Sequence, residues 1–72
     1  MYQRIRDLRE DADKNQTEMA GKLNCSQQTY SNYELGLRMI PPEILIQLAK
    51  IHNTSVDYLL GLTNVREPYP RA

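Results

Sequence analysis

The sequence has no Trp or Phe, a single cysteine and no long apolar run. The lone Cys25 cannot form an intramolecular disulfide, and no apolar run approaches the roughly 20 residues that cross a bilayer. Because the N-terminus also lacks the apolar stretch of a signal peptide, we expect a cytoplasmic protein with no membrane segment. Nine basic residues balance nine acidic ones, so the net charge indicates no partner of either sign.

Residues suited to catalysis or metal binding are also few. One cysteine and one histidine, Cys25 and His52, are too few for a zinc site of three or four ligands. Ser26, Ser31 and Ser55 lack the histidine and carboxylate arrangement of a nucleophilic triad, and the three glycines form no phosphate-binding loop. We therefore expect no enzymatic activity, no metal and no cofactor. A chain of 72 residues also leaves no room for a separate small-molecule effector domain.

Apolar spacing predicts helix nearly throughout. Ile5 and Leu8 lie on one face of a first helix over about residues 2–13. Asn15, followed three residues later by Glu18, is typical of a capping box at the start of a second helix. The residues that we expect to be buried in the later helices are Met19, Ala20, Leu23, Tyr30, Tyr33, Leu45, Leu48 and Ala49.

Capping residues mark the remaining helix boundaries. Ser26 is suited to cap a third helix, the Pro41-Pro42 pair to begin a fourth, and Ser55 to cap a short fifth. Residues that tolerate the left-handed conformation follow the second to fifth helices in turn: Asn24, Gly36, Asn53 and Gly61. The sequence thus predicts an all-α fold, with one domain over residues 1–63 and a loose, proline-containing tail over residues 64–72.

The most informative segment covers residues 16–36, where two short helices are joined by a tight turn. The second of these helices should expose four polar side chains: Gln27, Gln28, Ser31 and Asn32. Such a helix fits the major groove of DNA, where a side-chain amide can make a bidentate contact with adenine. This face carries no basic residue, so specificity would depend on amides rather than on arginine contacts with guanine.

The ordered series of residues resembles the Cro and phage-repressor type of helix-turn-helix, the XRE family of bacterial and phage regulators. The resemblance covers about residues 2–63 and rests mainly on Gln16-x-x-Met19-Ala20, Ser26-Gln27-Gln28-x-Tyr30-Ser31-Asn32-Tyr33-Glu34-x-Gly36 and Ser55-x-Asp57-Tyr58-Leu59-Leu60-Gly61. It implies a compact five-helix bundle of the lambda-repressor-like type, in which helices 2 and 3 form the helix-turn-helix. Two departures are Asn24, in place of the usual glycine, and Thr54, in place of an apolar residue.

The resemblance also implies roles for individual residues. Those expected to contact bases are Gln27, Gln28, Ser31 and Asn32. Those expected to contact DNA phosphates are Gln16, Thr17, Ser26 and Arg38, and Gln16 is also expected to help position the third helix. Arg9 and Glu34 are expected to form a structural ion pair.

These roles predict a transcriptional repressor that binds double-stranded DNA in a sequence-specific way. We expect a homodimer on a pseudo-palindromic operator, because one such module makes few base contacts. The fourth and fifth helices are the candidate dimer surface, through Ile44, Ile51, Val56, Leu60, Leu62 and Val65. Two alternatives remain open: a protein-interaction adaptor that keeps the fold without DNA binding, and an antitoxin that binds both a toxin and its operator.

Overall fold

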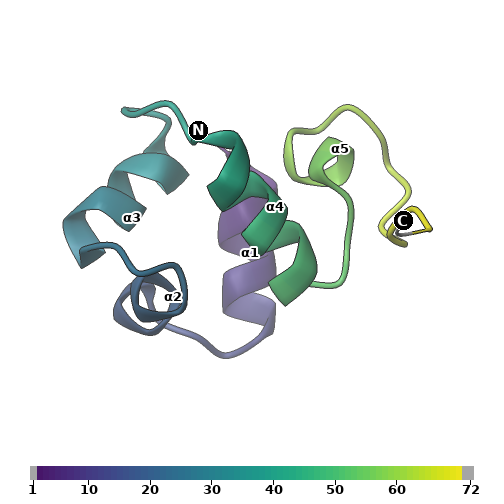
Figure 1. The fold of residues 1–72 in the computed structure, drawn as a ribbon. Coiled ribbons are helices and arrows are strands. Elements are labelled where there is room, and N and C mark those ends of the chain that lie inside the picture. Colours follow the sequence, from purple (N-terminus) through teal and green to yellow (C-terminus); the bar gives the residue numbers. More distant parts are fainter. Residues whose placement is uncertain (1, 71–72) are drawn as a thin grey trace.

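The computed structural model describes residues 2–70, which form five α-helices and no strand. The helices are α1 (Gln3–Asp11), α2 (Gln16–Lys22), α3 (Gln27–Leu35), α4 (Pro42–Ile51) and α5 (Val56–Leu59). In Figure 1, α2 and α3 lie at one end of the molecule, α1 and α4 occupy the middle, and α5 lies at the opposite end. The predicted all-α fold of five helices is confirmed. Within residues 2–70, no helix has the length and apolar character needed to cross a membrane.

The predicted N-caps are present and explain where three helices begin. Asn15 Oδ1 accepts a hydrogen bond from the Glu18 backbone N–H at 2.8 Å, while Glu18 Oε1 accepts from the Asn15 N–H at 3.0 Å. This reciprocal pair is a capping box. The Ser26 and Ser55 hydroxyls each accept from the backbone N–H three residues further on, at 3.1 and 3.0 Å.

A residue in the left-handed backbone conformation follows each of the five helices. These residues are Asp13, Asn24, Gly36, Asn53 and Gly61, with φ between 51° and 78°. The first helix is shorter than the predicted span of residues 2–13, because the chain turns at Asp13 and α1 ends at Asp11. Asn24 takes a φ of 56° in the turn between α2 and α3, a conformation that asparagine tolerates better than most non-glycine residues.

One apolar core joins all five helices. Its buried members are Ile5, Leu8, Met19, Ala20, Leu23, Tyr30, Tyr33, Ile40, Leu48, Ala49 and Leu59. The prediction that Leu45 is buried is only partly right, because Leu45 is half-buried at the edge of this core.

The candidate dimer surface on α4 and α5 needs a correction. Ile44 and Val56 are partly buried and pack against the core. Ile44 was predicted to face outward, but it lies one helical turn before the fully buried Leu48 and so shares its face of α4. The exposed apolar side chains of this end of the molecule are Ile46, Ile51, Leu62, Val65 and Tyr69.

Arg4 in α1 connects the beginning of the chain to its C-terminal segment. Its Nη1 donates hydrogen bonds to the carbonyls of Tyr58, at 3.1 Å, and Thr63. Its Nη2 donates to Asn64 Oδ1 at 2.6 Å. The guanidinium carbon also lies 4.2 Å from the centre of the Tyr58 ring, within the range of a cation–π interaction. Arg4 therefore links α1 to α5 and to the segment that follows it.

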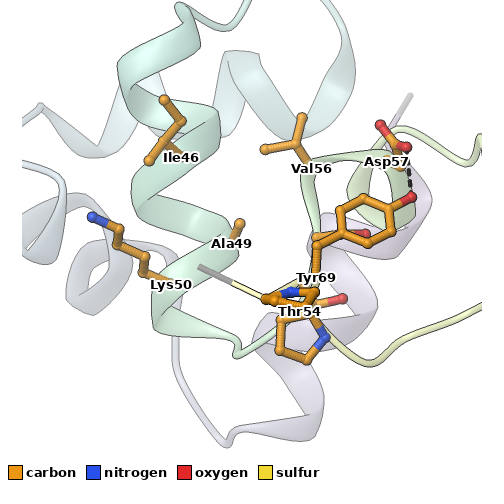
Figure 2. A pocket seen from close by; sticks show the side chains of 10 residues that line it. Ile46, Ala49, Lys50, Thr54, Val56, Asp57 and Tyr69 are labelled. Atoms are coloured by element: carbon orange, nitrogen blue, oxygen red, sulfur yellow. Dashed lines mark hydrogen bonds between the residues drawn. The ribbon is translucent and has the colours of Figure 1, made fainter. Parts of the chain in front are cut away.

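Residues beyond α5 make further contacts with the helical domain. The Thr54 hydroxyl donates to the Arg66 carbonyl at 2.6 Å, which satisfies a polar side chain that is only 1% exposed. The Tyr69 hydroxyl donates to Asp57 Oδ2 at 2.8 Å, and Figure 2 shows the Tyr69 ring alongside a pocket formed with α4 and α5. The division of the chain at residue 63 stays a prediction, but the segment up to Tyr69 lies against the domain.

We predict that Asn15→Ala lowers the free energy of unfolding by about 1 kcal/mol, because the capping box at the start of α2 is lost. Urea denaturation followed by circular dichroism measures this change. Gln47→Ala, at an exposed position within α4, is the control and should change stability by less than about 0.5 kcal/mol. Equal effects of the two substitutions would contradict a stabilising role of the cap.

Candidate nucleic-acid interface

The two helices α2 and α3 are held together by a tight turn. The Cys25 N–H donates to the Ala20 carbonyl at 3.0 Å, across the left-handed Asn24. Ser26 then caps α3 directly after the turn. Figure 1 shows the two short helices packed against each other at the end of the molecule away from α5. The turn therefore sets the direction of α3 relative to α2.

Helix α3 has one buried and one outer face. Tyr30, Tyr33 and Glu34 are buried, as the apolar pattern predicts for the two tyrosines. The side chains expected to contact bases lie on the remaining surface: Gln27 and Gln28 are exposed, and Ser31 and Asn32 are half-buried. The helix is therefore anchored through its inner face and presents a row of uncharged polar groups on the other.

Hydrogen bonds join the outer amides in two pairs. Gln27 Nε2 donates to Gln16 Oε1 of α2 at 2.7 Å. Gln28 Nε2 donates to Asn32 Oδ1, one turn further along α3, at 3.2 Å. Three of the four side chains expected to contact bases thus take part in a hydrogen bond, and Gln16 lies directly beside Gln27.

A buried ion pair lies under this surface. Arg9 Nε is 2.7 Å from Glu34 Oε2, and Arg9 Nη2 donates to Glu34 Oε1 at 3.2 Å. Arg9 Nη1 also donates to the Lys14 carbonyl at 2.9 Å, and Gln16 Nε2 donates to Glu34 Oε1 at 3.3 Å. The Glu34 side chain is only 2% exposed. Residues of α1, α2 and α3 therefore meet at a carboxylate that is almost fully shielded from solvent.

The surroundings of Glu34 keep it ionised. Burial alone would raise the pKa of its carboxyl group, but the neighbouring donors Arg9, Tyr30 and Gln16, with the charge of Arg9, outweigh burial and leave the pKa below its usual value. Glu34 in turn raises the pKa of Arg9. Burial and the neighbouring Glu34 carboxylate raise the pKa of the Tyr30 hydroxyl, so the phenol stays neutral.

The residues expected to contact phosphates are more dispersed. Gln16 is half-buried at the start of α2, next to the exposed Thr17. Ser26 is exposed at the start of α3, where its hydroxyl also donates to the Thr29 hydroxyl at 2.9 Å. Arg38 is exposed in the connection between α3 and α4. The structure thus brings Gln16 against Gln27 and places Arg38 on the loop that follows α3.

Two features of this end of the molecule were not evident from the sequence. The contact between Gln16 and Glu34 depends on how α2 crosses α3, and no local pattern in the sequence reports it. Cys25 is half-buried, and burial raises the pKa of its thiol although the charge of Arg38 opposes the shift. A thiol with a raised pKa is a poor nucleophile at neutral pH.

Among residues 2–70 no group of three or more potential metal ligands occurs.

Two short helices around a tight turn, the second with a buried inner face and an amide-rich outer face, define a helix-turn-helix domain. The chain belongs to the XRE-type helix-turn-helix family, whose model matches residues 5–59. This match confirms the family predicted from the sequence. The family consists of DNA-binding transcription regulators.

Two transcriptional regulators of Bacillus subtilis (strain 168) are similar to the chain. The uncharacterized HTH-type transcriptional regulator YobD is 36% identical over 69 residues, which cover 94% of this chain and 62% of the relative. The HTH-type transcriptional regulator ImmR is 39% identical over 62 residues, which cover 86% of this chain and 49% of the relative. The chain therefore spans between about half and three fifths of the length of these relatives.

Proposed function

We propose that the chain is a sequence-specific, double-stranded DNA-binding regulator that inserts α3 into the major groove and represses transcription. The outer face of α3 is the observation that supports this proposal most. It carries Gln27, Gln28, Ser31 and Asn32 without a charged side chain among them. Each amide can pair with adenine N6 and N7, and a good bidentate pair gives roughly 1–3 kcal/mol of discrimination between bases.

Contacts with the DNA backbone would hold α3 in register. Gln16, Thr17 and Ser26 lie at the starts of α2 and α3, and Arg38 follows α3 on an exposed loop. Contacts of this kind position a protein on the duplex but carry no sequence information. Because only Arg38 among these residues is charged, we expect binding to depend modestly on salt.

The shape of the molecule suits a two-fold dimer on a pseudo-palindromic operator. The chain is 31 Å long, and α3 and α5 lie at opposite ends (Figure 1). Two copies joined near α5 would each leave α3 free at the far end, so that each α3 could enter one half-site of the operator. The exposed Ile51, Leu62 and Val65 are the apolar residues of the proposed surface that remain available for this contact.

The zero net charge favours a second candidate, a protein-interaction adaptor that keeps the fold without binding DNA. Most DNA-binding domains have a basic excess. The two functions differ in one measurable respect, because an adaptor would show no salt-dependent, sequence-selective affinity for DNA.

We predict that the protein binds the DNA flanking its own gene selectively and that Gln27→Ala/Gln28→Ala abolishes the selectivity. Fluorescence anisotropy with specific and scrambled duplexes across a salt series measures both. Arg38→Ala is the matched comparison: it should weaken binding to every duplex about equally and make the salt dependence shallower, because it removes only a phosphate contact. Absence of binding at low salt by the folded protein would favour the adaptor.

A further inference from the structure

The Glu34 side chain determines the direction of the hydrogen bonds around it. An ionised carboxylate can only accept hydrogen bonds. Arg9 donates to both of its oxygens, at 2.7 and 3.2 Å, and is itself held by the Lys14 carbonyl. The carboxylate is therefore fixed in place, and any further neighbour within hydrogen-bond distance must offer a donor.

Gln16 is such a neighbour, and the carboxylate dictates which way its amide faces. The Gln16 atom that lies 3.3 Å from Glu34 Oε1 is Nε2. The reverse orientation would place two acceptors against each other, so only one orientation is stable. Gln16 Oε1 must then point away from Glu34, and Gln27 Nε2 donates to it at 2.7 Å.

The exposed Gln27 is oriented in the same way by Gln16. Its Nε2 is committed to Gln16 Oε1, because the reverse orientation would again oppose two acceptors. Its Oε1 and its second N–H remain available, with their relative positions set. These are the acceptor and the donor that match adenine N6 and N7 in the major groove.

Gln28 provides a contrast within the same helix. Its partner Asn32 is also an amide, and no carboxylate is bonded to either of them. If both amides turn over together, the hydrogen bond between them is kept with donor and acceptor exchanged. The orientation of Gln28 is thus left open, whereas that of Gln27 is determined.

We propose that Glu34 is a positioning residue for DNA sequence specificity, which acts through Gln16 to set the donor and acceptor that Gln27 presents to a base. This inference rests on the proposed function, since it concerns the base preference of α3. Glu34 would then have a role beyond stabilising the fold, although this buried carboxylate does not itself touch DNA.

The test is selection of binding sites from a randomised duplex library. Gln27→Ala and Gln28→Ala first identify the base positions that these two residues recognise in the sites selected by the wild-type protein. Glu34→Gln then replaces the acceptor by an amide that can face Gln16 either way. At the Gln27 position we expect base discrimination to fall about tenfold, and at the Gln28 position it should stay within about twofold.

Two further variants separate this role from a structural one. Gln16→Met removes the link without altering the Arg9–Glu34 pair and should reduce discrimination at the same position, even if Glu34→Gln fails to fold. Glu10→Gln removes an equivalent charge from the exposed ion pair with Arg6 and should keep the wild-type preference.

Unchanged discrimination at the Gln27 position in folded Glu34→Gln or in Gln16→Met would overturn the positioning role while leaving the proposed function intact. An equal loss at all positions would overturn it too, because it would indicate a general loss of structure. If the wild-type protein selects no sequence at all, the proposed function itself fails.

Discussion

Replacing Glu34 by alanine should lower the free energy of unfolding by about 3 kcal/mol or more. The substitution leaves the Arg9 guanidinium, whose side chain is only 11% exposed, without its counter-charge. It also removes an acceptor from Gln16 and opens a space where α1, α2 and α3 meet. Breaking one side of a buried ion pair is more costly than the net contribution of the intact pair, because the remaining charge stays desolvated.

Chemical denaturation at neutral pH measures the effect of Glu34→Ala, and Glu10→Ala is the matched control. The Arg6–Glu10 pair has the same chemistry, but its side chains are 46% and 51% exposed. An exposed pair of this type contributes up to about 0.5 kcal/mol. Similar losses in the two variants would show that burial of the Arg9–Glu34 pair has no energetic consequence.

The same carboxyl group should make stability depend on acid pH. The pKa of Glu34 is lower in the folded protein than its usual value of about 4.3 in an unfolded chain. Its contribution is therefore fully present above that value and is lost as the pH falls through the folded pKa. Glu34→Gln should show a shallower loss of stability below about pH 4 than the wild-type protein in pH-dependent denaturation.

Protonation of His52 also affects stability, but at a higher pH, and His52 is present in both the wild-type protein and Glu34→Gln. Burial, with the charges of Arg66 and Lys22, lowers the pKa of this imidazole. The folded protein thus favours neutral His52, and stability is lost as the pH falls below about 6.5, where the unfolded chain takes up the proton. Because both proteins contain His52, the difference between wild type and Glu34→Gln isolates the carboxyl group.

Features that depend on neighbours in sequence could be predicted well. The caps at Asn15, Ser26 and Ser55 each involve a side chain and a backbone N–H three residues away, so the residue type at one position decides them. The left-handed turns at Asn24 and Gly36 are local for the same reason. The resemblance added the arrangement of the helices in one compact bundle, which local patterns alone do not provide.

Features that depend on how distant elements pack could not be predicted. Ile44 is a different case, because its spacing of one helical turn from Leu48 already indicates the buried face of α4. Arg4 resembles any exposed arginine in the sequence, but residues 58–64 come back to its guanidinium. The hydrogen bond between Gln16 and Glu34 joins residues 18 positions apart, and the proposed positioning role of Glu34 depends on it.

The second large effect concerns the apolar core. Leu48→Ala should lower the free energy of unfolding by 2–5 kcal/mol, estimated as roughly the cost of a truncated side chain plus the cavity it leaves. Leu48 is 0% exposed, within a cluster that draws residues from every helix. Leu37→Ala is the control, because Leu37 is 74% exposed in the connection between α3 and α4 and should change stability by less than about 0.5 kcal/mol.

The size of the domain decides what this loss means for function. A domain of 72 residues has a total stability of roughly 4–11 kcal/mol at 0.05–0.15 kcal/mol per residue. Leu48→Ala could therefore remove half or more of it, and DNA binding should fail in proportion to the unfolded fraction although no DNA-facing residue has changed. Thermal denaturation and anisotropy on the same samples test this. A Leu48→Ala protein that melts like Leu37→Ala would show that the core repacks around the missing side chain without cost.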